Sequence, residues 1–171
     1  MYEQASQNEG VDEFESPYHN GMLDPFHQLG QIPLFETNRG CPYECTFCTW
    51  GIAAFNKVRR YPIDRVYGEL EYVATNFPNL PAWIIADGNF GILRRDVEIA
   101  EKIKELREKT PALRHILTWE SKNTSDRNFE IAQIMGNDVG DVLMAVQTLD
   151  PVVQESIKRD NINMDHVPQK V

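Results

Sequence analysis

The segment Ile32-Pro-Leu-Phe-Glu-Thr-Asn38 is short and apolar, and Arg39-Gly40 connects it directly to Cys41-Pro-Tyr-Glu-Cys45-Thr-Phe-Cys48. The first segment predicts a β-strand that runs into a loop, because a glycine after an apolar run favours a turn. All three cysteines of the chain lie on that loop, with the spacing C-x3-C-x2-C. Cysteines used only for packing would be scattered through a core. Their clustering therefore indicates a metal or cluster site.

Helix-like and strand-like segments alternate along the rest of the chain. Apolar residues at helical spacing predict helices from about residue 62 to 77, 96 to 109, 126 to 135 and 151 to 159. Further strands are predicted at residues 82–86, 113–119 and 142–146. Such alternation is typical of an α/β fold with a parallel sheet, here a partial barrel of about four βα units.

A polar cluster follows each predicted strand. In a barrel-like parallel sheet the loops after the strands converge on one rim, where ligands bind. We therefore expect one shared site, built from the segments 41–48, 87–91, 120–123 and 147–150.

The composition excludes some classes of function. The 171 residues carry 26 acidic and 17 basic side chains, a net charge of −9, which argues against nucleic-acid binding. The sequence contains no apolar run long enough to span a membrane and no signal peptide. An odd number of cysteines cannot form a complete disulfide framework, so we expect a reduced, cytoplasmic setting.

The acidic charge is concentrated at the N-terminus. Residues 1–38 contain seven acidic side chains and no lysine or arginine. We therefore expect residues 1–31 to form a solvated acidic arm and residues 32–171 to form the folded core.

The cysteine spacing allows two kinds of metal site. Three thiolates can hold three irons of a cubane iron–sulfur cluster and leave the fourth iron open, an arrangement typical of catalytic sites. Zinc held by the cysteines and a histidine is the alternative, although structural zinc sites prefer paired C-x2-C spacing. The available histidines are His19, His27, His115 and His166.

The loop Cys41-x3-Cys45-x2-Cys48, with Phe47 before the last cysteine, resembles the signature of the radical S-adenosylmethionine (SAM) superfamily. The longer string from Phe35 to Gly51 is similar to the cobalamin-binding branch of that superfamily. The other segments that resemble this branch, in family order, are Ser16-Pro-Tyr18, Asp87-Gly-Asn-Phe-Gly91, Gln147-Thr-Leu-Asp-Pro151 and Lys158-Arg-Asp-Asn-Ile162.

The resemblance implies a role for the cysteine loop. Cys41, Cys45 and Cys48 would ligate a [4Fe–4S] cluster whose open iron takes the amino and carboxylate groups of SAM. Reductive cleavage of SAM to a 5′-deoxyadenosyl radical would then serve radical methylation or related C–C or C–S chemistry. Phe47 matches the position that contacts the adenine of SAM.

The resemblance also implies SAM contacts at the ends of later strands. Asp87, Gly88 and Asn89 stand where the family places the motif that holds the SAM amino group, although the usual Gly-Gly-Glu is absent here. Glu120 and Gln147 are candidates for contacts with the SAM carboxylate or ribose. Gln147 has the alternative role of capping the following helix.

The family further implies partners and missing parts. A small-molecule substrate is expected, together with an electron donor of the flavodoxin or ferredoxin type, which the basic residues Lys57, Arg59 and Arg60 could attract. Those three residues have the alternative of simply forming a solvated loop. We expect no nucleic-acid or membrane partner.

The family barrel usually has about six βα units, so residues 32–171 are expected to be a radical SAM core that is incomplete at its C-terminus. Cobalamin would bind through a domain that this sequence lacks. The alternative function is an iron–sulfur-binding fragment, catalytically incomplete, that needs a partner chain.

Overall fold

The α/β architecture is confirmed by a parallel three-stranded sheet. The computed structural model describes residues 11, 14–52, 56–120, 126–136 and 146–159. Within them, β4 (Ala82–Phe90) lies between β1 (Leu34–Phe35) and β5 (His115–Glu120), and both neighbours run parallel to it. Of the strand predicted at 142–146, residues 142–145 lie outside the described residues.

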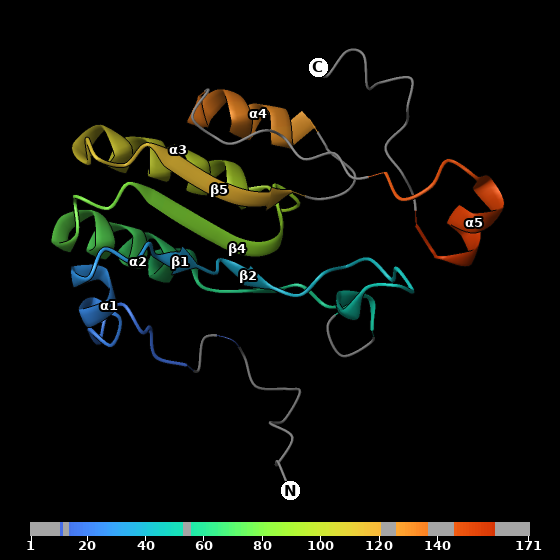
Figure 1. Ribbon diagram of the computed structural model, residues 1–171, viewed down its shortest axis with the longest axis horizontal. Coiled ribbons are helices and arrows are strands. Elements are labelled where there is room, and N and C mark those ends of the chain that lie inside the picture. The colour runs from blue at the N-terminus through green and yellow to red at the C-terminus, as the bar shows by residue number, and fades with distance from the viewer. Residues whose placement is uncertain (1–10, 12–13, 53–55, 121–125, 137–145, 160–171) are drawn as a thin grey trace, which may run out of the picture.

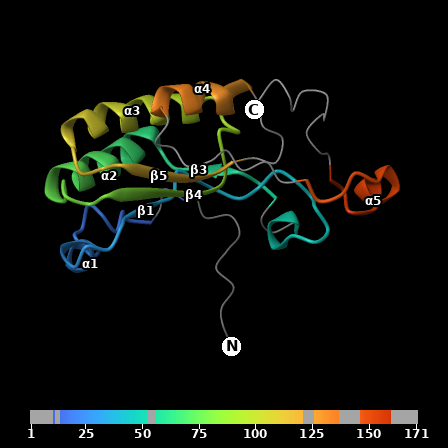
Figure 2. The same cartoon turned by 45° about the horizontal axis from the view of Figure 1, so that its top comes forward.

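Helices α2 (Ile63–Asn76), α3 (Arg95–Lys109) and α4 (Asp126–Met135) cover one face of the sheet (Figures 1 and 2). Their bounds agree closely with the predicted helices. Gly136 ends α4 with a φ of 74°, the left-handed conformation expected of a C-terminal glycine. None of the helices in the described ranges is both long and apolar enough to cross a membrane.

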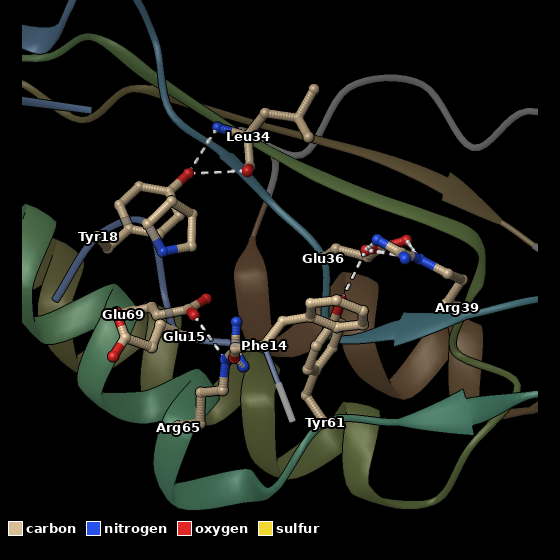
Figure 3. A pocket seen from close by; sticks show the side chains of 10 residues that line it. Phe14, Glu15, Tyr18, Leu34, Glu36, Arg39, Tyr61, Arg65 and Glu69 are labelled. Atoms are coloured by element: carbon tan, nitrogen blue, oxygen red, sulfur yellow. Dashed lines mark hydrogen bonds and ion pairs between the residues drawn. The ribbon is translucent and has the colours of Figure 1, made fainter. Parts of the chain in front are cut away.

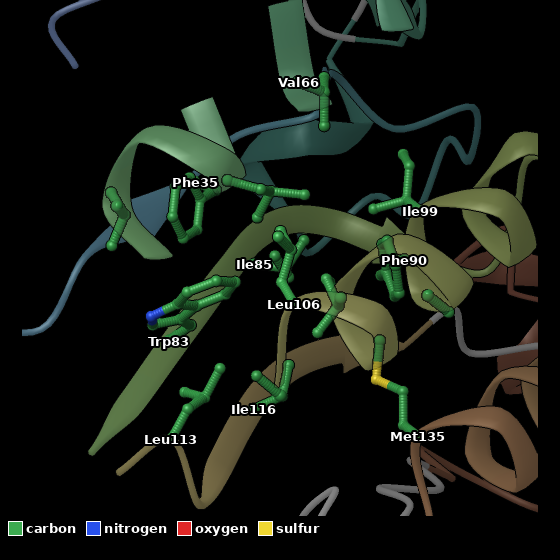
Figure 4. Packing of buried hydrophobic residues seen from close by; sticks show 14 of the residues in the cluster. Phe35, Val66, Trp83, Ile85, Phe90, Ile99, Leu106, Leu113, Ile116 and Met135 are labelled. Carbon is green, nitrogen blue, oxygen red and sulfur yellow. The ribbon is translucent and has the colours of Figure 1, made fainter. Parts of the chain in front are cut away.

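The core lies between this helical layer and the sheet (Figure 4). Alternate residues of β4 point towards the helices, because side chains of a strand alternate between its two faces. Trp83 and Ile85 are completely buried there, and Phe35 of β1 is 1% exposed. The helical residues predicted from their spacing face the same layer, and those that are buried include Val66, Leu70, Val73, Ile99, Ile103 and Leu106.

The first predicted strand, 32–38, is divided in the structure. After β1 the chain leaves the sheet, and β2 (Asn38–Arg39) pairs antiparallel with β3 (Arg59–Arg60). Two-residue strands carry no periodic signal, which is why the sequence did not predict this pair. Residues 40–58 start and end at the pair, so the cysteine-bearing excursion is closed at its base.

We expected residues 87–91 to form a loop, but residues 87–90 belong to a strand. Strand β4 continues to Phe90, and its register with β5 shifts between Ile85 and Phe90. Ile85 lies opposite Thr118 whereas Phe90 lies opposite Glu120, so β4 bulges between these pairs. Polar and glycine residues predict a loop, but β-bulges accept them and are common beside functional sites.

Part of the N-terminal arm packs against the folded core. Its described part is not simply solvated, because Tyr18 and His27 are only 3% and 6% exposed. The Tyr18 hydroxyl donates to the Leu34 carbonyl at 2.7 Å and accepts from the Leu34 amide at 3.1 Å. It thereby satisfies part of the free edge of β1, which would otherwise lack hydrogen-bond partners. The short helix α1 (Asp24–Gln28) was not predicted.

Candidate functional site

The cysteine loop places three free thiols close together in the chain. Cys45 is buried, with 6% exposure, and Cys41 and Cys48 are half-buried. The Cys48 amide donates to the Cys45 carbonyl at 3.1 Å, which forms a turn ahead of the 3₁₀ helix η2 (Thr49–Gly51). Across the residues that the structure describes, no three His, Cys, Asp or Glu side chains gather closely enough to hold one metal ion. A cubane cluster does not require such convergence, because each thiolate binds a different iron.

Gly51 packs directly on the backbone of Cys45. A Cβ atom at Gly51 would lie 2.3 Å from the Cys45 carbonyl oxygen and 2.9 Å from its nitrogen. No side chain fits at this position without moving the loop. Glycine is therefore required here by close approach, and the φ of Gly51 is not positive.

The segment that directly follows helix α5 (Pro151–Ser156) contacts the cysteine loop, and α5 itself lies on the same side of the molecule (Figures 1 and 2). The Thr46 amide donates to the Ile157 carbonyl at 3.1 Å, and Lys158 pairs with Glu44 at 3.3 Å. The Arg159 guanidinium lies 5.9 Å from the centre of the Phe47 ring. A cavity of about 550 Å³ opens between loop and helix, lined by Pro42, Tyr43, Glu44, Pro151, Gln154, Glu155, Lys158 and Arg159.

Gln147 does not cap the helix that follows it, because another residue is the N-cap of α5. Asp150 is the N-cap, since its carboxylate accepts from the amides of Val152 and Val153 at 2.8 and 3.1 Å. Gln147 is exposed and precedes this cap, so the capping role belongs to Asp150. The helix ends at Ser156, earlier than predicted, because Lys158 adopts a φ of 49° and turns the chain back towards the cysteine loop.

Asp87 lies in the bulged part of β4 and is fully enclosed, with 1% exposure. One carboxylate oxygen accepts from the amides of Thr37 and Asn38 at 2.7 and 3.1 Å. The other accepts from the Asn38 side-chain nitrogen at 2.6 Å and from the Thr37 hydroxyl. Burial raises the pKa of Asp87 to about 6, and these hydrogen bonds oppose part of that rise.

The two residues after Asp87 retain more freedom to contact a ligand. Gly88 is exposed, and a Cβ there would meet only the Gly40 carbonyl oxygen, at 3.8 Å. Asn89 is 5% exposed, and its side-chain nitrogen has no hydrogen-bond partner within the described part of the chain. Glu120 ends β5 opposite Phe90. The sheet therefore brings residues 87–89 and 120 to one end, beside the start of the cysteine loop.

The basic residues singled out in the sequence lie at the base of the same loop. Arg59 and Arg60 form β3, and Lys57 and Arg60 are exposed. Arg39 of β2 joins them through the β2–β3 pairing and forms an ion pair with Glu36 at 2.5 Å. The β2–β3 pair therefore adds Arg39 to the predicted basic residues Lys57, Arg59 and Arg60.

A second cavity, of about 390 Å³, lies between the N-terminal arm, β1 and α2 (Figure 3). Four of its charged side chains form two ion pairs, Arg65 with Glu69 at 2.9 Å and Arg39 with Glu36. The Tyr61 hydroxyl also donates to Glu36 at 3.2 Å. The residues that line this cavity include none of the predicted cluster or SAM contacts.

Residues 35–166 match the radical SAM superfamily, which covers most of the chain. The chain belongs to this superfamily. It is 37% identical over 161 residues to the cobalamin-dependent radical SAM methyltransferase TokK of Streptomyces tokunonensis, covering 88% of this chain and 23% of TokK. It is also 37% identical over 164 residues to the 2-(S-pantetheinyl)-carbapenam-3-carboxylate methyltransferase of Streptantibioticus cattleyicolor, covering 90% of this chain and 24% of that protein. The predicted resemblance to the cobalamin-binding branch is confirmed.

Solved structures show the same fold. The radical SAM methyltransferase TsrM of Kitasatospora setae, solved with cobalamin and a [4Fe–4S] cluster, superimposes with a TM-score of 0.61 at 15% identity, over 81% of this chain and 26% of TsrM. The cobalamin-dependent enzyme OxsB gives a TM-score of 0.53 at 19% identity, over 82% of this chain and 22% of OxsB. The predicted partial βα barrel of the radical SAM type is confirmed. The chain spans about a quarter of the length of the curated relatives it matches.

Proposed function

We propose that this chain is the cluster-bearing part of a cobalamin-dependent radical SAM methyltransferase. The observation that carries the proposal is the cysteine loop, which leaves and re-enters the fold at β2 and β3, at the end of the parallel sheet where ligands of such folds bind. The 37% identity to two methyltransferases of this kind supports the type of reaction.

Cys41, Cys45 and Cys48 would hold a [4Fe–4S] cluster. When bound, this group would supply the electron that splits SAM into methionine and a 5′-deoxyadenosyl radical. The donor set fits, because three free thiols on one loop match a cubane with one iron left for SAM. The chain would contribute the loop geometry, through Gly51 beneath Cys45 and α5 beside residues 44–47.

Further residues would orient SAM. The Phe47 ring is 52% exposed and has the Arg159 guanidinium beside it, so it can offer a surface to the adenine. Gly88 would allow close approach of SAM to the backbone of β4, and the Asn89 amide would contribute a hydrogen bond. Glu120 and Gln147 stay candidates for the carboxylate or ribose.

The remaining partners are proposed from charge and family. Lys57, Arg59 and Arg60, together with Arg39, would attract an acidic electron donor of the flavodoxin or ferredoxin type to the base of the cysteine loop. Cobalamin would bind to a domain outside these 171 residues, and the substrate would be a small molecule.

The test is anaerobic reconstitution with iron and sulfide, followed by reduction in the presence of SAM. We expect about four irons per chain, and loss of iron binding in the variants Cys41→Ala, Cys45→Ala and Cys48→Ala. Thr46→Ala is the matched control, because Thr46 contacts Ile157 through its backbone amide, which the substitution keeps. Failure of the wild-type chain to take up iron, or uptake that does not depend on these cysteines, would overturn the proposal.

A second candidate function is an iron–sulfur-binding fragment that is catalytically incomplete by itself. It is favoured by the fact that the chain spans about a quarter of the length of its relatives. In this second proposal the chain holds the cluster but completes its active site only with a partner chain. Formation of 5′-deoxyadenosine by the isolated chain distinguishes the two. A loaded cluster without SAM cleavage supports the second proposal.

A further inference from the structure

We propose that Asp87 is a positioning residue that sets where the cysteine loop begins, and that it does not bind SAM directly. This inference rests on the proposed function, because it assigns a task to a residue of the same site. It also replaces the role that the family resemblance implied for Asp87.

The hydrogen-bonding capacity of the Asp87 carboxylate is filled by its neighbours. An ionised carboxylate offers about four acceptor sites. All four are used by donors from Thr37 and Asn38, two from backbone amides and two from side chains. The three residues are at most 1% exposed, so neither water nor a ligand reaches the carboxylate. The SAM amino group would have to displace one of these donors and leave it buried without a partner.

Asp87 also binds the chain at the point where it leaves the sheet. Strand β1 pairs with β4 only through Leu34 opposite Ile84 and Phe35 opposite Ile85. Beyond Phe35 the chain leaves the sheet, and the amides of Thr37 and Asn38 lose the partners that a longer strand would provide. The Asp87 side chain accepts from both amides. It therefore determines the point of departure, three residues before Cys41.

The same segment is also held from its other side. Arg95 of α3 donates to the Thr37 carbonyl at 2.6 Å and to the Tyr61 carbonyl at 2.5 Å. The Tyr61 amide also donates to the Thr37 carbonyl, at 3.1 Å. The outgoing and the returning ends of the loop are thus joined at Thr37. Asp87 accepts its amide and Arg95 binds its carbonyl, so that the position of Thr37 is set by groups on β4 and α3.

The test uses Asp87→Asn and Thr37→Val, with Asp96→Asn as the matched control. The amide introduced by Asp87→Asn would place an NH₂ group against the Asn38 side-chain nitrogen, so that two donors face each other. Asp96 is equally buried, but one of its oxygens accepts only from Gly91 and Leu93, both at 2.9 Å. Its other oxygen has no hydrogen-bond partner among the described residues. The same chemical change at Asp96 therefore removes no hydrogen bond to the cysteine loop.

The first readout needs no cluster. Amide hydrogen exchange of residues 36–48 in the metal-free chain should accelerate about ten- to hundredfold in Asp87→Asn, the factor expected for losing a hydrogen bond to a charged group. Thr37→Val should show a smaller acceleration in the same segment, and Asp96→Asn none. Unchanged exchange in both Asp87→Asn and Thr37→Val overturns the inference. Thr37→Val keeps the shape of the site, so the comparison survives if Asp87→Asn does not fold.

The second readout is the iron bound per chain after reconstitution at a temperature where all variants are folded. We expect reduced loading in Asp87→Asn and wild-type loading in Asp96→Asn. A wild-type chain that binds no iron refutes the proposed function while the exchange result still decides the role of Asp87. Full loading of Asp87→Asn combined with weakened SAM binding would instead identify Asp87 as a direct ligand.

Discussion

The close packing of Gly51 on Cys45 predicts that even a methyl group at residue 51 displaces the cysteine loop. In Gly51→Ala the new methyl group would lie 2.3 Å from the Cys45 carbonyl oxygen, whereas real Cβ atoms essentially never approach closer than 3.0 Å. The neighbouring atom belongs to the backbone, so no side chain can swing aside. The loop around Cys45 must therefore move by about 0.7 Å or more, the difference between these two distances.

We expect this displacement to lower stability and cluster binding together. Overpacking of this kind costs about 1–3 kcal/mol. Each kcal/mol lowers the melting temperature of a domain of this size by about 2–4 °C. Thermal unfolding of the metal-free chain measures the first effect. Iron content and the electron paramagnetic resonance signal of the reduced cluster measure the second.

Gly88→Ala is the control, because a methyl group there would meet only ordinary contact at 3.8 Å. It should keep its iron content and its melting temperature to within about 2 °C. Gly51→Ala with unchanged melting temperature and full iron loading would refute the packing of Gly51 beneath Cys45 and, with it, the described path of the loop.

Three further predictions follow from the core, a helix and a buried carboxyl. Trp83→Ala should reduce the free energy of unfolding by about 3–5 kcal/mol, measured by chemical denaturation, because the completely buried ring leaves a cavity; a loss below about 1 kcal/mol would contradict its burial. Gly68→Ala should raise stability by about 0.5–1 kcal/mol, since alanine favours α2 and only the exposed His19 ring, 2.9 Å away, must move; destabilisation would show that the ring cannot move. Burial raises the pKa of Asp87 from 3.8 to about 6, so the native state holds this proton over that range. The unfolding free energy should therefore fall by about 3 kcal/mol as pH rises from about 3 to 7, with about 2 kcal/mol of that fall between pH 4 and 6. Asp87→Asn should lack this part of the pH dependence, and equal slopes in both proteins would refute the raised pKa.

Much of the fold was predictable because its signals are local. Helices α2, α3 and α4 each bury a stripe of apolar residues that is visible in the sequence as helical spacing, and Gly136 marks the end of the last of them. The buried strand around Trp83 is likewise evident from its run of apolar residues. Alternation of such segments is sufficient to predict the α/β class and a parallel sheet.

The elements that sequence reasoning missed depend on contacts between distant residues. The β2–β3 pair consists of two residues from each side of the cysteine loop, too few for any periodic pattern. Tyr18 belongs to an acidic arm whose composition predicts solvent exposure. Its hydroxyl nevertheless donates to the carbonyl of Leu34, sixteen residues later, at the free edge of β1. Residues 87–89 have the composition of a loop, but neighbouring backbone keeps them in a bulged strand.

The sequence by itself predicted the class of site, because the chemistry of three thiols at C-x3-C-x2-C spacing depends on residues within one short segment. It also determined the family, since the remaining motifs follow in order along the chain. Only the tertiary structure decided how the residues around those thiols divide their tasks. Asp87 accepts all its hydrogen bonds from Thr37 and Asn38. The Asn89 side-chain nitrogen has no partner among the described residues, and the Phe47 ring lies beside Arg159. Such assignments depend on which groups are buried together, and burial is a property of the folded chain and of no single segment.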